Sequence, residues 1–163
     1  MLLPRIANAE SSALILSGVP GDDEHAVRFA KWTETLQTIL VDQMSFDASR
    51  VIVLSGEKTA QAHIKSAFVR LKEQLRPADT FFLFFIGHGT YDGLDYKFNI
   101  FGHDFTASEY NSLLATLSLK SHTTTLSLGR VSGKPFVLTP RDWPDDRSAL
   151  VMSTGCHRVA FRI

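Results

Sequence analysis

The run TFFLFFIG, residues 80–87, constrains the fold of this chain more than any other stretch. Every residue from Phe81 to Ile86 is apolar, and a glycine follows directly. A strand with one face in water alternates apolar and polar residues, whereas an unbroken apolar run of this length is typical of a strand buried on both faces. We therefore predict that residues 80–86 form an inner strand with further layers on both sides.

Two more apolar runs and two helical patterns precede this strand. Residues 13–18 (ALILSG) and 50–56 (RVIVLSG) also end in glycine and are predicted to be strands. Apolar residues recur every three or four positions over residues 24–41 and 59–76, which predicts two amphipathic helices, and Pro77 lies just beyond the second. This alternation predicts an α/β fold: a three-layer sandwich with a mainly parallel sheet and helices on both faces.

The composition excludes several classes of protein. A single domain is expected from 163 residues, and the 44% of apolar residues argue against a disordered chain. The 17 basic side chains are balanced by 17 acidic ones, which leaves no overall field to hold nucleic acid or an anionic membrane. No stretch approaches the roughly 20 apolar residues of a membrane span. The single cysteine, Cys156, excludes an internal disulfide.

No cofactor or metal is predicted. His103, His157, Asp92, Asp95 and Asp104 carry metal-ligating groups, but no pair of them lies at i, i+4 on a predicted helix or at a known zinc spacing. Solvated loops explain these residues better. The loop SGVPGDDE after the first strand lacks the pattern of a phosphate-binding loop and places acids where phosphates would lie, so we reject a phosphate site there.

The first eleven residues are set apart from the domain, which is taken to span residues 12–163. They contain Ala7-Asn8-Ala9, a pattern that signal peptidase cleaves. Only residues 1–3 stand where an apolar segment of about 7 to 15 residues should precede such a site. The pattern is either the remnant of a signal peptide or a chance match, so an exported and a cytoplasmic location both remain open.

The glycines that follow the predicted strands direct attention to one edge of the sheet. In parallel α/β sheets, ligands bind at the carboxyl ends of the strands. Gly18, Gly56 and Gly87 all stand there, and His88 lies between Gly87 and Gly89. Because glycine lets the backbone approach a ligand closely, GHG can present an imidazole and backbone N–H groups to one cleft. The alternative interpretation is a turn with a solvated histidine.

Residues 13–117 resemble the caspase and legumain superfamily of cysteine endopeptidases, in particular the bacterial caspase-like proteins. The matching segments are ALILSGVPGDDE, VIVLSG, RPADTFFLFFIGHG and DYKFNIFGHDFTASEYNSLLATL, the last with a helix entered at Thr106 or Ser108. The resemblance implies that His88 is the catalytic base and that the N–H of Gly89 holds the oxyanion. It also implies a peptide or protein substrate.

The nucleophilic cysteine that the resemblance implies should follow the strand after the helix 106–117. Two runs compete for that strand. HTTTLSLG (122–129) comes first, but no cysteine follows it closely, and only Ser132 stands near the expected place. SALVMSTGCHRV (148–159) is the more apolar run and ends in Cys156.

The predicted site therefore consists of His88 and Cys156 as catalytic residues, with the backbone of Gly89 and Gly155 at the oxyanion. A thiolate is nucleophilic and an imidazole titrates near neutrality, so the pair suits attack on a peptide carbonyl. Two features depart from the family: Thr154 stands where an acidic residue is usual, and the chain ends seven residues after Cys156, where the family continues. We therefore expect a caspase-like domain that is truncated or degenerate after residue 117 and poorly defined beyond residue 118.

Two functions fit this interpretation. One is a cysteine-type endopeptidase with His88 and Cys156 as its dyad, and the other is a non-catalytic caspase-like domain, either a binding pseudoenzyme or a degenerate remnant. A flavodoxin-like nucleotide binder is a third interpretation, because strand–helix alternation is common to many doubly wound folds. The distance between His88 and Cys156 distinguishes the first two. The sequence does not indicate the preferred substrate residue or the oligomeric state.

Overall fold

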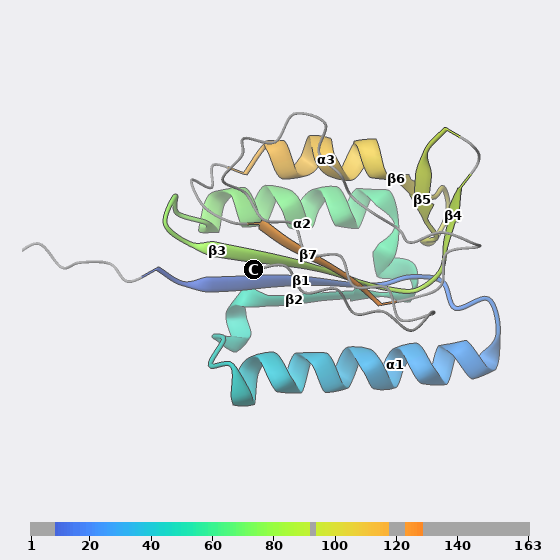
Figure 1. The fold of residues 1–163 in the computed structure, drawn as a ribbon, viewed down its shortest axis with the longest axis horizontal. Coiled ribbons are helices and arrows are strands. Elements are labelled where there is room, and N and C mark those ends of the chain that lie inside the picture. The colour runs from blue at the N-terminus through green and yellow to red at the C-terminus, as the bar shows by residue number, and fades with distance from the viewer. Residues whose placement is uncertain (1–8, 92–93, 118–122, 129–163) are drawn as a thin grey trace, which may run out of the picture.

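The computed structural model describes residues 9–91, 94–117 and 123–128 (Figure 1). Its main sheet contains four parallel strands in the order β2-β1-β3-β7, namely β1 (Ser11–Ser17), β2 (Val51–Ser55), β3 (Thr80–Ile86) and β7 (Thr123–Leu128). One face is covered by α1, and the other by α2 and α3 (Figure 1). These helices span Asp23–Thr38, Gln61–Gln74 and Ala107–Ala115. The α/β fold with three layers is therefore confirmed.

Shorter elements lie between these strands and helices. Two 3₁₀ turns and a π-helical turn span Ala48–Arg50, Gly56–Thr59 and Ile39–Gln43. A small antiparallel sheet has the strand order β4-β5-β6, with strands at Gly89–Tyr91, Tyr96–Phe98 and Phe105–Thr106. This sheet was not predicted from the sequence, because strands of two or three residues are too short to show an alternating pattern.

The register of the main sheet brings the carboxyl ends of the first three strands level. Strand β1 lies between β2 and β3, and its last residue, Ser17, stands opposite Ser55 of β2 and Ile86 of β3. The predicted parallel pairing of these three strands is confirmed. As a consequence, Gly18 and Gly87 directly follow paired residues at one edge of the sheet.

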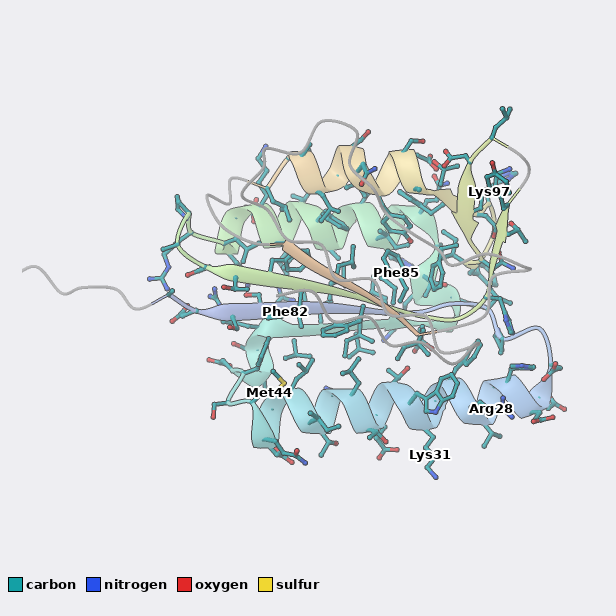
Figure 2. All side chains as sticks on the ribbon, in the orientation of Figure 1. Arg28, Lys31, Met44, Phe82, Phe85 and Lys97 are labelled. Atoms are coloured by element: carbon teal, nitrogen blue, oxygen red, sulfur yellow. The ribbon has the colours of Figure 1, made fainter. Side chains whose placement is uncertain are left out.

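The core has two halves, one on each face of the sheet. Side chains alternate between them: Leu83 and Phe85 join the cluster under α2 and α3, whereas Phe84 and Ile86 join the cluster under α1. Figure 2 shows Phe85 on the α2 and α3 side, and Phe82 packs against the α1 cluster. Both faces of β3 are thus covered by helices, which explains why its sequence is apolar without interruption.

The helix boundaries follow local capping signals. The side chain of Asp22 caps α1 by accepting a hydrogen bond from the N–H of His25, and α1 continues past Thr38 as the π-helical turn. Thr106 is the N-cap of α3, and its side chain and that of Glu109 bond reciprocally to each other's backbone N–H. In the described residues, no helix is long and apolar enough to cross a membrane.

Strand β1 begins at Ser11, one residue before the start at residue 12 that the sequence pattern predicts for the domain. The N–H of Glu10 donates to Asp79 Oδ1 at 3.0 Å, and its carbonyl accepts a hydrogen bond from the N–H of Thr80 at 2.9 Å. Ser11 is already paired with Thr80 in the β1–β3 ladder. The polar side chains of these first residues concealed the start of the strand, since the apolar pattern begins later. Residues 7 and 8 of the signal-peptidase pattern lie outside the described residues.

Candidate functional site

The loops after β1 and β3 are held together by the end of β5. Asn99 donates its N–H to the carbonyl of His88 at 3.0 Å and accepts the N–H of Val19 on its own carbonyl at 3.0 Å. A Cβ at Gly18 would lie 2.3 Å from the Asn99 oxygen, and one at Gly87 would lie 2.9 Å from the ring of Phe98. Only glycine fits at both strand ends, because the β5 backbone and the Phe98 ring cross them so closely.

The ring of His88 is fixed from the loop after β1. Its Nε2 lies 3.0 Å from the carbonyl oxygen of Pro20. A carbonyl can only accept, so Nε2 carries the proton, and in the neutral ring Nδ1 is left as the acceptor. The ring is partly exposed. This is the arrangement of an imidazole whose orientation and tautomer are set by one backbone contact while its second nitrogen can take up a proton.

The first turn of α1 forms a wall beside His88. The ring of His25 meets that of His88 edge to face with centroids 4.6 Å apart, and the Phe29 ring lies 5.1 Å away. His25 Nδ1 lies 2.8 Å from a carboxylate oxygen of Asp22. Hydrogen bonds from the backbone N–H and then the ring of His25 hold the pKa of Asp22 below its usual value, and the two imidazoles contribute further.

The N–H of Gly89 is not used by the β4–β5 ladder. Hydrogen-bonded and non-hydrogen-bonded pairs alternate along antiparallel strands. Since Asn99 bonds to the carbonyl of His88, the next pair, Gly89 and Phe98, is of the non-hydrogen-bonded kind. The N–H of Gly89 therefore points away from β5.

The structure decides which of the two competing runs forms the strand after α3. Residues 123–128 pair with β3 over the register from Phe81↔Thr123 to Ile86↔Leu128. Residues 123–128 of the first run thus occupy the strand position next to β3. Ser132, Gly155 and Cys156 lie outside the described residues. The predicted pairing of His88 with Cys156 therefore stays a prediction.

Of the four predicted site residues, the structure describes His88 and Gly89. His88 and Gly89 stand together at the carboxyl end of β3, as predicted. The contacts from Pro20 and from the Asp22–His25 pair were missed. A carboxylate N-cap followed by histidine three residues later is a visible signal in the sequence, but its position beside His88 is not. No three metal-ligating side chains lie close enough to hold an ion among residues 9–91, 94–117 and 123–128.

The fold and the edge of the sheet define an α/β protein of three layers with its candidate site at the carboxyl ends of parallel strands. No family model matches the chain, and no curated protein does. Among solved structures, it is similar to the protein GSU0716 of Geobacter sulfurreducens, with a TM-score of 0.57 and 19% sequence identity. The match covers 76% of this chain and 52% of that chain, so this chain spans about half the length of its structural neighbour. The similarity supports the fold alone.

Proposed function

We propose that this chain is a caspase-like domain related to cysteine-type endopeptidases, with His88 as the general base. The observation that carries the proposal is the bond from His88 Nε2 to the Pro20 carbonyl at 3.0 Å. A general base needs a neighbour that orients it and leaves the working nitrogen free. His88 has this neighbour, and it stands where ligands bind in parallel sheets, at the carboxyl end of an inner strand.

In the proposed reaction, Cys156 supplies the nucleophile. Nδ1 of His88 takes the proton from the thiol, and the thiolate attacks the carbonyl carbon of the peptide bond. The resulting oxyanion accepts hydrogen bonds from the backbone N–H groups of Gly89 and Gly155. The imidazolium of His88 then gives its proton to the leaving amine, and water releases the acyl group from sulfur. The proposal requires Cys156 Sγ within about 7 Å of the His88 ring, which allows for loose geometry without substrate.

The second candidate is a non-catalytic caspase-like binding domain. The observation that favours it is the identity of β7: the strand beside β3 is Thr123–Leu128, and the cysteine nearest to it in the chain is 28 positions further on. In the family, the nucleophile follows this strand directly. If Cys156 does not reach His88, the cleft at the sheet edge can hold a peptide but not cleave it.

Alkylation of Cys156 separates these two functions without a known substrate. A thiol paired with an imidazole has a pKa below the roughly 8.5 of free cysteine, so iodoacetamide should modify Cys156 appreciably at pH 6. In the His88→Ala variant the alkylation profile should move to higher pH. Cys156 is the single cysteine, so the mass of the intact protein reports its modification directly.

The control for this experiment is His157→Ala, because His157 is the immediate neighbour of Cys156 and can lower the pKa of the thiol by itself. A profile that moves with His157 and ignores His88 supports the non-catalytic domain. So does a thiol that does not react in the folded protein. A His88–Cys156 separation beyond about 12 Å in a crystal structure of the full chain would exclude the dyad.

A further inference from the structure

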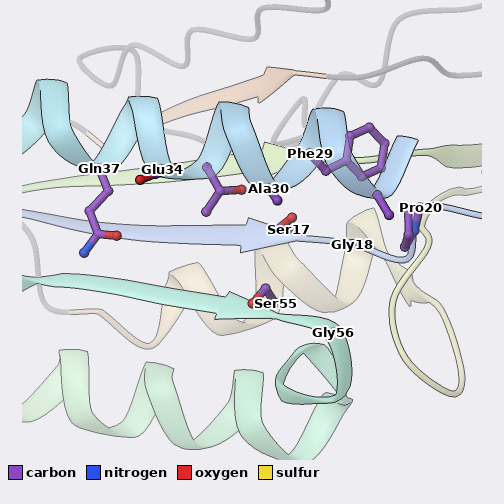
Figure 3. Close-up of a pocket in the computed structure, with 11 residues that line it drawn as sticks. Ser17, Gly18, Pro20, Phe29, Ala30, Glu34, Gln37, Ser55 and Gly56 are labelled. Atoms are coloured by element: carbon purple, nitrogen blue, oxygen red, sulfur yellow. The ribbon is translucent and has the colours of Figure 1, made fainter. Parts of the chain in front are cut away.

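The strands of the main sheet have different surroundings at their two ends. At the carboxyl ends of β1 and β2, a groove beside α1 is lined by Gly18 and Ser55 among others (Figure 3). At the amino ends, the residues directly before β1, β2 and β3 are charged and contact one another, namely Glu10, Arg50 and Asp79. This charged cluster lies away from the candidate site, and the peptidase function does not use it.

Glu10 is held in place by residues that follow it in the chain. Its N–H donates to Asp79 Oδ1 at 3.0 Å, and its carbonyl accepts the N–H of Thr80 at 2.9 Å. Its side-chain Oε2 lies 2.8 Å from Arg50 Nη1 and 3.0 Å from Arg76 Nη2. These four contacts are enough to keep the backbone nitrogen of Glu10 beside Asp79 whether or not residues 1–9 are attached.

The carboxylate of Asp79 is a strong acceptor for this nitrogen. Asp79 is 0% exposed, and its other oxygen already accepts Nη2 of Arg50 at 2.7 Å. The donor from Glu10 is a neutral peptide N–H. A hydrogen bond between a carboxylate and a charged donor is roughly twice as strong as one between neutral groups. An ammonium group at the Glu10 nitrogen would therefore bind Asp79 more tightly than the peptide N–H does.

The charges that surround this nitrogen are of both signs. The guanidinium groups of Arg50 and Arg76 repel an added positive charge, but both also bond to the side chain of Glu10, which offsets this repulsion. The carboxylates of Glu10 and Asp79 attract it. The contact with Asp79 is at hydrogen-bond distance and buried, where opposite charges are screened least.

The sequence places a cleavage pattern directly before the same nitrogen. Ala7-Asn8-Ala9 carries the small residues that signal peptidase requires, and Glu10 is the next residue. Hydrolysis of the Ala9–Glu10 bond adds the OH of water to the Ala9 carbonyl carbon and the hydrogen to the Glu10 nitrogen. The proton of the new acid then moves to the amine, so Ala9 ends in a carboxylate and Glu10 begins with an α-ammonium. The cleavage pattern and the contact to Asp79 are independent observations, and both concern one atom.

We propose that residues 1–9 are removed by cleavage of the Ala9–Glu10 bond, and that the new α-ammonium of Glu10 binds the buried carboxylate of Asp79. The cleaving peptidase is of the class that requires small residues at positions 7 and 9. The ammonium joins the start of β1 to the turn before β3, so the cleaved chain is more stable than the uncleaved one. This processing goes beyond the proposed peptidase function and does not depend on Cys156.

The first test determines where the natural chain begins. Intact-mass spectrometry and N-terminal sequencing of the protein isolated from the cells that produce it should give a chain that begins at Glu10. A chain in which Ala9 is still joined to Glu10 would overturn the proposal. Ala9→Leu in the natural gene should leave residues 1–9 attached, because a large side chain stands before the bond. Cleavage of that variant at the same bond would contradict the role of the pattern.

The second test compares the chains 10–163 and 9–163 with the full chain. All the described strands and helices lie within residues 10–163. The chain 9–163 is the matched control, because its free amine belongs to Ala9 and the nitrogen of Glu10 remains a neutral amide. The thermal unfolding midpoint at pH 7 should be about 2–4 °C higher for 10–163 than for either longer chain. Equal midpoints of 10–163 and 9–163 would refute the pairing.

The pH dependence of this difference tests the charge on the amine. Pairing with Asp79 raises the pKa of the α-amine above the roughly 7.7–8.0 of an unfolded chain. The stabilisation is therefore present at pH 7 and lost as the pH rises through the folded-state pKa. The midpoints of 10–163 and 9–163 should converge by about pH 10. A difference that persists there would show that an ammonium is not its cause.

Substitution of Asp79 tests the partner. Asp79→Asn should abolish the difference between 10–163 and 9–163 at pH 7, whereas Asp42→Asn, which alters an exposed carboxylate in the π-helical turn, should preserve it. A difference that survives Asp79→Asn would exclude Asp79 as the partner of the ammonium. If the Asp79→Asn chains do not fold, the pH series on the unsubstituted chains decides the question.

Discussion

Replacing Asp79 by asparagine should cost this protein much of its stability, although the residue lies far from the candidate site. Asp79 is 0% exposed at the amino end of β3. Its Oδ1 accepts the N–H of Glu10 at 3.0 Å, and its Oδ2 accepts the N–H of Arg76 at 3.1 Å and Nη2 of Arg50 at 2.7 Å. The carboxylate thus connects the start of β1, the segment before β2 and the turn before β3.

The expected loss of stability follows from the hydrogen bonds that an asparagine at position 79 can still accept. Its carbonyl oxygen can keep the bond from Glu10, but its NH₂ group then faces the two donors from Arg76 and Arg50. Two hydrogen bonds to a charged group are lost, at about 1.5–3 kcal/mol each. Removing one member of a buried ion pair costs about 3–5 kcal/mol in other proteins. We expect Asp79→Asn to lower the free energy of unfolding by about 3–5 kcal/mol, measured by urea denaturation at pH 7.

The pH dependence gives this prediction a second test. Burial raises the pKa of Asp79, but the hydrogen bonds from Glu10 and Arg76 and the charge of Arg76 outweigh it, so the pKa lies below the 3.8 that is usual for an aspartate. A lowered folded-state pKa contributes stability that is present above the unfolded value and lost as the pH falls through the folded value. The difference between wild type and Asp79→Asn should therefore shrink below about pH 4.

The control is Asp42→Asn, an exposed carboxylate in the π-helical turn, which should change stability by less than about 0.5 kcal/mol. If Asp79→Asn costs less than about 1 kcal/mol at pH 7, or if its cost does not fall in acid, the carboxylate does not hold this corner of the fold and the reasoning is wrong.

Three further changes test local features by chemical denaturation. Gly18→Ala should destabilise the fold by about 3 kcal/mol because its Cβ meets the backbone oxygen of Asn99. The control Gly21→Ala, with φ at +84° and open space around it, should cost only about 1–2 kcal/mol. Equal costs of the two substitutions would contradict the close approach of Asn99 to Gly18. Thr106→Ala should cost about 1 kcal/mol by removing the N-cap of α3, and Thr106→Ser should restore most of it. Tyr110→Phe should leave stability unchanged or raise it, because the buried hydroxyl has no hydrogen-bond partner among the described residues, and a loss above 1 kcal/mol would reveal one. Burial also raises the pKa of Tyr110 well above 10.0, so its absorbance should not change with pH before the protein unfolds.

The inner strands and the helices that cover them were predictable because burial leaves a direct trace in the amino-acid order. A strand covered on both faces must be apolar at every position, as in residues 80–86, and a helix on a sheet must repeat its apolar residues every three or four positions. The same reasoning placed His88 at the carboxyl end of β3. The short strands β4, β5 and β6 were not predictable in this way, because two or three residues show too little alternation of apolar and polar side chains to recognise.

The environment of His88 depended on tertiary structure, because it is made of contacts between residues far apart in the chain. The Pro20 carbonyl and His88 Nε2 are separated by 68 positions, and no local pattern links them. Residues 123–128 form the strand beside β3 although the competing run at 148–159 is the more apolar, so apolar character alone did not identify this strand. Apolar periodicity determines which segments become strands and helices, whereas hydrogen bonds and packing between distant segments determine which of them meet and which polar groups they bring together.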